Sequence, residues 1–198
     1  MYKKYFKRLI DIIIALIGLP FFAVIYIFVG TLIKLDDRGP IFYVDRRIGK
    51  NSKIINMYKF RSMKVNAPDI RNIDGSTFNS KNDPRLTRLG RFLRETSIDE
   101  VPQLLNVLKG DMSIIGPRAS MESALETYKD DEKDKMLVKP GISGYTQAYY
   151  RNGLTVREKR IKDAWYANNV SFILDIRIFF KTISTVFKKE NLYTNSDI

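Results

Sequence analysis

Cysteine and histidine are both missing from the 198 residues of the sequence. Without cysteine, the chain can form no disulfide bond, no thiolate metal site and no thiol nucleophile. Without histidine, it lacks the commonest general base and the commonest metal ligand. If the chain is an enzyme, its chemistry must therefore rest on carboxylates, hydroxyls, amides and cations.

Negative charge is also scarce, because 22 Asp and Glu stand against 34 Lys and Arg and leave a net charge of +12. Such an excess favours anionic partners, which include nucleic acid, phosphate-bearing substrates and acidic membrane surfaces. The length suits one ordinary domain with a hydrophobic core and an appended element. Charge and length alone do not choose among these partners.

Charge is absent from one long stretch, Ile12 to Ile33, which reads IIIALIGLPFFAVIYIFVGTLI. As a continuous helix this stretch would extend about 33 Å, which is enough to cross the hydrocarbon core of a bilayer. It is longer than the apolar part of a signal peptide, and no cleavage site of small residues follows it. We therefore predict a membrane helix with its basic flank in residues 1–35, followed by a separate domain in residues 36–198.

Pro20 lies near the middle of this stretch, and an interior proline removes a helix hydrogen bond and predicts a kink. Both ends of the stretch carry basic residues, with Lys7 and Arg8 before it and Lys34 and Arg38 after it. Basic flanks favour the cytoplasmic side of a membrane, and a straight span cannot keep both flanks there. We therefore favour a re-entrant helix, which bends at Pro20 and returns to the same side, over a single span.

The remaining sequence alternates short apolar runs with turn residues, which predicts an α/β fold that is dominated by helices and contains a small sheet. We expect strands at Ile41–Val44 and Ile54–Phe60, and a long polar loop at Asn66–Arg85. Arginine then recurs at every third position, namely at Arg85, Arg88, Arg91 and Arg94. This arginine group forms either a solvated basic helix face or a set of side chains that grip phosphate.

Apolar residues at helical spacing, followed by Gly110, predict a helix across residues 101–109. A short strand should follow and turn at Gly116-Pro117-Arg118, and Lys139–Ile142 has the Pro-Gly centre of a type II turn. Near the C-terminus, an amphipathic helix over about residues 171–189 carries an apolar face formed by Phe172, Ile176, Phe179, Ile183 and Val186. That face either packs on the core or lies in a membrane interface.

Two acids stand side by side at Asp99 and Glu100. Ser97 and Glu100 fit a capping box at the start of the predicted helix, which would give both acids a structural role. Alternatively they form a catalytic pair, because a carboxylate at a helix N-terminus stays ionised and can bind Mg²⁺ or attack phosphorus. The neighbouring arginine group, the Arg118 turn, the membrane segment and the lack of histidine favour phosphoryl transfer at a membrane.

Three motifs in order carry a family resemblance. KFRSM begins at Lys59, TSIDEVPQLLNVLKGDMSIIGPR runs from Thr96 to Arg118, and KPGISG begins at Lys139. Together with the apolar N-terminal segment and the aromatic and basic C-terminal helix, they resemble the small monotopic phosphoglycosyl transferases. These are the initiating sugar transferases of bacterial glycan, capsule and exopolysaccharide synthesis, and the resemblance covers essentially the whole chain.

This resemblance implies Mg²⁺-dependent transfer of a phosphosugar from a UDP-sugar to polyprenol (undecaprenyl) phosphate, with release of UMP. It implies that Asp99 is the nucleophile of a two-step reaction and forms a covalent phosphosugar intermediate. It implies that Glu100 positions the metal or assists proton handling, so that Asp99 and Glu100 both serve the metal site. The residues that it implies for substrate binding are Lys59, Arg94, Arg118, Gln147 and Arg151.

The resemblance further implies a location at the bacterial cytoplasmic membrane, with the catalytic domain on the cytoplasmic face, in contact with anionic lipids and without nucleic acid. Many relatives carry Ser-Pro where this chain has Ala23-Val24, which displaces the expected bend, and a second proline where it has Ala119, which loosens the Arg118 turn. Taken alone, the residues also allow a membrane-tethered protein that binds nucleic acid. A non-catalytic scaffold, in which the two acids only cap a helix, is a further alternative.

Overall fold

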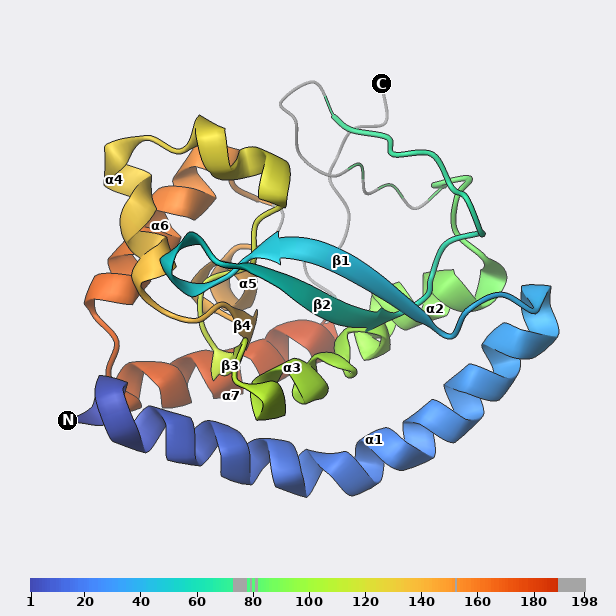
Figure 1. Cartoon of the computed structure of the whole chain (residues 1–198), viewed down its shortest axis with the longest axis horizontal. Coiled ribbons are helices and arrows are strands. Elements are labelled where there is room, and N and C mark those ends of the chain that lie inside the picture. Colours follow the sequence, from blue (N-terminus) through green and yellow to red (C-terminus); the bar gives the residue numbers. More distant parts are fainter. Residues whose placement is uncertain (73–77, 79, 81, 152, 189–198) are drawn as a thin grey trace.

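The computed structural model describes residues 1–72, 78, 80, 82–151 and 153–188, and helices predominate among them (Figure 1). The helices are α1 (Lys7–Asp37), α2 (Arg88–Thr96), α3 (Gln103–Lys109), α4 (Asp130–Lys133), α5 (Tyr145–Tyr149), α6 (Val156–Asn168) and α7 (Phe172–Lys188). The strands are β1 (Phe42–Ile48), β2 (Ile54–Phe60), β3 (Ser113–Ile115) and β4 (Gly141–Ser143). Within the described residues the strands form two sheets of two strands each, so the predicted helix-dominated fold is confirmed with two small sheets in place of one.

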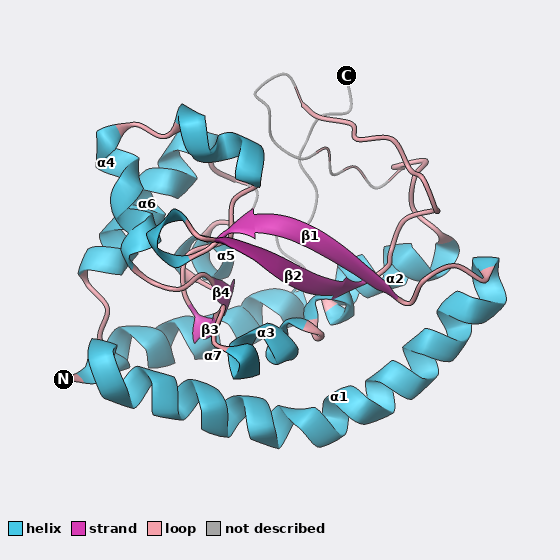
Figure 2. Ribbon diagram, in the orientation of Figure 1, coloured by secondary structure: helices cyan, strands magenta, loops and turns pink. Residues whose placement is uncertain are grey.

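The antiparallel hairpin of β1 and β2 pairs Phe42 with Phe60 at one end and Ile48 with Ile54 at the other. β2 has the predicted bounds, whereas β1 runs past its predicted end at Val44. The strand continues because the charged residues after Val44 keep their places in the ladder while their side chains form ion pairs. Figure 2 shows the hairpin as a twisted ribbon, with α3 between its middle and α1.

The second sheet is a parallel pair in which Ser113 of β3 lies opposite Gly141 of β4. The predicted type II turn at Lys139–Ile142 is wrong, because Gly141 belongs to a strand and lacks the positive φ that such a turn needs. Glycine is required there for close approach instead, since a Cβ atom on Gly141 would lie 2.1 Å from the backbone nitrogen of Gly116. The short strand predicted before Gly116 is confirmed as β3.

The helix α3 lies close to its predicted position, and α2 carries the last three arginines of the arginine group. Thr87 caps α2, because its hydroxyl accepts a hydrogen bond from the backbone N–H of Gly90 at 2.9 Å. Gly110 ends α3 with a φ of 95°, as its position in the sequence predicts. The described residues of the predicted loop 66–85 form no helix and no multi-residue strand, and its other residues lie outside the described part of the chain.

The long helix α1 is continuous from Lys7 to Asp37 and passes through Pro20. In Figure 1 it forms a bow whose concave side faces the other elements. Ala15 and Ile33 on the inner side are 0% and 3% exposed. Its most apolar window reaches a mean hydropathy of 2.9 and is only 11% buried, so by length and composition the helix is able to cross a membrane. The exposed apolar residues of α1 include Leu9, Ile13, Leu16, Ile17, Phe21, Val24, Ile27, Phe28 and Leu32.

The helix α7 points an unexpected side toward the core. Ile178, Asp175 and Thr185 are buried there, with exposures of 0%, 6% and 5%. The predicted apolar face is exposed instead at Phe172, Ile176, Phe179 and Ile183, so packing of that face on the core is wrong. The reason is that polar bonds fix the other side: Asp175 accepts from buried Tyr166, and Thr185 donates to a backbone carbonyl of α5.

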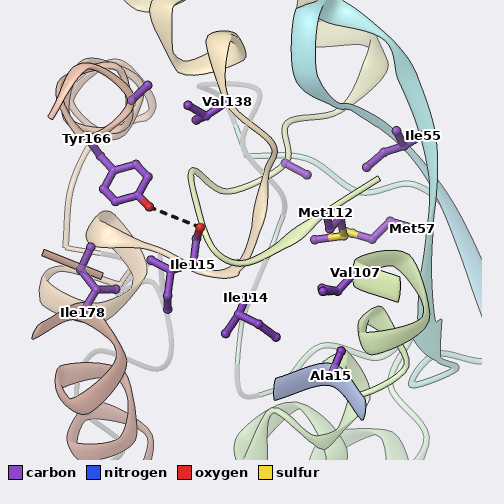
Figure 3. Packing of buried hydrophobic residues seen from close by; sticks show 13 residues of the cluster. Ala15, Ile55, Met57, Val107, Met112, Ile114, Ile115, Val138, Tyr166 and Ile178 are labelled. Carbon is purple, nitrogen blue, oxygen red and sulfur yellow. Dashed lines mark hydrogen bonds between the residues drawn. The ribbon is translucent and has the colours of Figure 1, made fainter. Parts of the chain in front are cut away.

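The main hydrophobic cluster joins α1, β2, α3, β3, α6 and α7 (Figure 3). Val107 of α3 and Met112, which precedes β3, are fully buried at its centre, beside Met57 of β2. Tyr166 of α6 donates its hydroxyl to the carbonyl of Ile115 at 3.3 Å, as the dashed line in Figure 3 marks. This packing fixes the ends of β2, α3 and β3 relative to one another, and these ends carry the candidate site.

Candidate active site

The two acids lie in a 3₁₀ turn, Ile98–Glu100, between α2 and α3. Ser97 begins this turn in the left-handed region with a φ of 59° and makes no side-chain cap hydrogen bond. The predicted capping box is therefore wrong, since a capping residue needs an extended backbone and Ser97 instead closes α2. The turn leaves both carboxylates free to serve another purpose than capping α3.

Glu100 is held by two cations from distant parts of the chain. Lys59 of β2 places its Nζ 2.7 Å from Oε1, and Arg118, which follows β3, places an Nη 3.4 Å from the same oxygen. Burial raises the pKa of Glu100, but Lys59 and then Arg118 more than offset this and bring the pKa to about 2. Glu100 is therefore ionised at neutral pH, and within the described chain its Oε2 accepts no hydrogen bond.

Asp99 differs from its neighbour, because its carboxylate has no hydrogen bond or ion pair from the described residues although only 7% of the residue is exposed. Burial raises its pKa, the charge of Lys59 lowers it in part, and the charge of Glu100 adds to the rise, which leaves a pKa of about 6. Burial is thus the largest influence on the pKa of Asp99, and the predicted effect of the helix N-terminus stays a prediction. At pH 7 about nine tenths of such a carboxyl is nevertheless ionised.

Arg94 of α2 is the third cation beside the acids. Its Nε donates to the hydroxyl of Ser62 at 3.1 Å, which holds the guanidinium in place. Burial lowers the pKa of Arg94, and the charge of Asp99 opposes that shift more than any other carboxylate does. Ser62 was not predicted as a site residue, although it lies within the KFRSM motif.

Within the described residues, the remaining members of the arginine group make no hydrogen bond or ion pair with the two acids. Arg85 is buried and pairs with buried Asp83 at 2.7 Å, which is a structural role. Arg88 and Arg91 are exposed on the outer side of α2. The group therefore divides, because Arg85 precedes α2 and, within α2, a spacing of three residues drifts around a helix of 3.6 residues per turn.

A small cavity opens beside the acidic pair and is lined by Glu100 and Arg118. Arg47 of β1 and Gln103 of α3 also line it, and the sequence analysis missed both. Gln103 is 2% exposed, and its position next to Pro102 gave no signal of a polar side chain turned inward. The cavity thus combines cationic and amide donors around one carboxylate.

Gln147 and Arg151 lie in and just after α5. The Gln147 side chain donates to the carbonyl of Ile142 at 3.2 Å, and its buried Oε1 accepts no hydrogen bond from the described residues. Arg151 has a φ of 46°, in the left-handed region. Their part in substrate binding stays a prediction, whereas Lys59, Arg94 and Arg118 are brought to the acidic pair as expected.

The described residues contain no cluster of three or more acidic side chains that could hold a metal ion. Mg²⁺ is commonly bound by one or two carboxylates, and phosphate oxygens of a substrate supply further ligands. Asp99 and the Oε2 of Glu100 both lack a hydrogen-bond donor within the described part of the chain. The pair therefore fits a Mg²⁺ site that a substrate completes.

Several curated proteins are similar in sequence to this chain. The chain is 37% identical to the undecaprenyl-phosphate galactose phosphotransferase of Salmonella typhimurium, over 96% of this chain but only 42% of that protein. It is 39% identical to the exopolysaccharide production protein PSS of Rhizobium leguminosarum, over 89% of this chain and 92% of that protein. It is 37% identical to the uncharacterized sugar transferase EpsL of Bacillus subtilis, over 97% of this chain and 92% of that protein. The chain thus spans less than half of some longer relatives and nearly all of shorter ones.

The family model described as bacterial sugar transferase matches residues 2–189, which include α1, the acidic pair and α7. This match extends over nearly the whole described chain and contains every residue of the candidate site. The chain belongs to the bacterial sugar transferase family.

Proposed function

We propose that this chain transfers a sugar phosphate from a UDP-sugar to undecaprenyl phosphate and releases UMP, as the first membrane step of exopolysaccharide, capsule or other glycan synthesis. The observation that carries the proposal is the buried carboxylate of Asp99, free of protein hydrogen bonds within the described residues and surrounded by Lys59, Arg94 and Arg118. The names of the Salmonella and Rhizobium relatives, which cite undecaprenyl phosphate and exopolysaccharide, support the substrates and the pathway class.

The reaction takes two steps in this proposal. In the first, a carboxylate oxygen of Asp99 attacks the phosphorus that carries the sugar, the bond between that phosphorus and the bridging oxygen breaks, and UMP leaves with that oxygen. In the second, a phosphate oxygen of undecaprenyl phosphate attacks the same phosphorus and Asp99 leaves as a carboxylate. The product is undecaprenyl-diphosphate-sugar, and no proton must be transferred, which suits a site without histidine.

The cations have complementary roles in this scheme. Negative charge spreads over the phosphoryl oxygens in the transition state, so preorganised cations supply the main stabilisation. Lys59 and Arg118 are oriented by Glu100, and Arg94 is oriented by Ser62. Asp99 and Glu100 would hold Mg²⁺, which when bound would neutralise charge on the diphosphate of the donor.

The bow of α1 supports a re-entrant position in the membrane. Its outer side is apolar and exposed, and in Figure 1 both of its ends rise toward the rest of the protein. The helix α7 also has an exposed apolar side, and its first residue, Phe172, packs its ring against Tyr2, just before α1, at 5.7 Å. We therefore place the active site on the cytoplasmic face, where a UDP-sugar is available and anionic lipids meet the basic flanks.

Replacing the proposed nucleophile should stop the reaction. Asp99→Asn keeps the size of the side chain but removes its negative charge, so release of UMP from a UDP-sugar should fall by about 10³-fold or more. The measurement is UMP release in the presence of Mg²⁺ and undecaprenyl phosphate. Asp130→Asn, at an exposed residue that pairs only with Lys133, is the control and should match the wild type. Full activity of Asp99→Asn would exclude Asp99 as nucleophile.

The pH dependence should follow Asp99. Its pKa is about 6 and the attacking form is the deprotonated one, so kcat/KM should rise with pH through about 6 and then level off. Lys59 lowers this pKa, and Lys59→Gln should therefore move the acid limb to higher pH. A wild-type profile that is flat between about pH 5 and pH 8 would contradict the assignment.

Removal of divalent metal should abolish turnover, because the proposed Mg²⁺ neutralises charge on the diphosphate of the donor. Only two carboxylates and that diphosphate are proposed to bind the ion, so a chelator should remove it. UMP release is measured after chelation and again after stepwise addition of Mg²⁺. We expect loss of activity and its return. Unchanged activity in excess chelator would rule out the proposed metal site.

The membrane topology can be tested by thiol labelling, since the chain has no cysteine of its own. Lys4→Cys places a single thiol in the turn just before α1, and Asp36→Cys places one in its last turn. In sealed vesicles, an impermeant maleimide should label both from the same side if the helix is re-entrant. Labelling from opposite sides would establish a single span.

A further inference from the structure

The first turns of α1 carry two charged side chains that reach into the catalytic part of the chain. The Arg8 guanidinium donates to the carbonyls of Val107 at 2.5 Å and Leu108 at 3.0 Å. These carbonyls belong to the last turn of α3, where the helix dipole favours a cation, and the carbonyl of Val107 also accepts from the N–H of Gly110 at 3.0 Å. Arg8 therefore acts as a side-chain cap on the end of α3 opposite the acidic pair.

Asp11, one turn further along α1, holds a different element. Its Oδ1 accepts from the Ser113 hydroxyl and from the backbone N–H of Ile114, each at 2.9 Å, and Asp11 is 4% exposed. Both partners belong to β3, which leads directly into the turn that carries Arg118. A buried carboxylate with two donors is costly to remove, so this contact fixes β3 against α1.

Through Arg8 and Asp11, α1 contacts the two elements that flank the site, namely α3 and β3. The α3 helix follows the turn that carries Asp99 and Glu100, and β3 precedes Arg118. Arg118 and Glu100, which lie 3.4 Å apart, therefore belong to two different segments, and each segment has its own contact with α1. Close packing continues the contact, since a Cβ atom on Gly18 would lie 2.9 Å from the side chain of Leu104.

We propose that Arg8 and Asp11 are positioning residues of the transferase site, which set the acidic pair and Arg118 relative to each other through α3 and β3. The membrane helix is then part of the catalytic framework as well as an anchor. The inference rests on the proposed function, because it concerns the same site. Misplacement of reacting groups by about 1 Å costs about 10²-fold in rate, which sets the scale of the effect.

The test uses the full chain in detergent micelles with a UDP-sugar, Mg²⁺ and undecaprenyl phosphate. Arg8→Gln and Asp11→Ala should lower kcat by about 10- to 100-fold, with KM for the UDP-sugar within about twofold. Asp11→Asn keeps an acceptor oxygen for Ser113 and Ile114 and should restore most of kcat. Lys4→Gln removes a basic charge from the same flank without touching α3 and should behave as the wild type.

Fold and insertion are followed by circular dichroism, thermal midpoint and sedimentation with vesicles. If Asp11→Ala does not fold, Ser113→Ala takes its place in the comparison, because it removes one of the two donors to Asp11 and leaves Asp11 itself unchanged. Normal kcat in folded Arg8→Gln and Asp11→Ala would overturn the inference, as would loss of activity that merely tracks the folded fraction. A wild type that releases no UMP would instead overturn the proposed function.

Discussion

The placement of two adjacent carboxylates among cations, with Asp99 buried and Glu100 half-buried, is the constraint on which the structure of the site depends. An unpaired charge inside a protein costs several kcal/mol, so Glu100 must be met by a cation from elsewhere in the chain. Lys59 arrives on β2 and Arg118 after β3, and both bind the same oxygen. The elements that carry them must therefore converge on the turn before α3, and the hydrophobic core is arranged so that they do.

The short helix α3 is the centre of this arrangement. Its Asn106 is fully buried and bonds the backbone of β2 twice, through Tyr58 at 2.9 Å and Asn56 at 2.7 Å. These two hydrogen bonds fix the position of Lys59, the next residue of β2 after Tyr58, relative to Glu100. Because α1 binds the far end of the same helix through Arg8, the long apolar helix and the segment that carries the acidic pair are one packed unit.

The sequence motifs predicted which residues lie together better than the local patterns predicted the structure around them. The motifs identified Asp99, Glu100, Lys59 and Arg118, and the structure brings these together. The capping box failed because the partner of Glu100 lies on β2, and a local pattern cannot reveal a partner that distant. The apolar side of α7 was ambiguous for a related reason: periodicity shows that a helix has an apolar side, but the bonds of Asp175 decide which side faces the core.

The division between the two acids leads to the central claim, that Asp99 is the group that bonds to phosphorus while Glu100 orients cations. The most direct measurement is the intact mass of the protein after incubation with a UDP-sugar and Mg²⁺ in the absence of undecaprenyl phosphate. We expect a gain equal to one sugar phosphate, located by peptide mapping at Asp99 and lost when undecaprenyl phosphate is added. An active enzyme that gains no such mass, or gains it at another residue, would contradict the account.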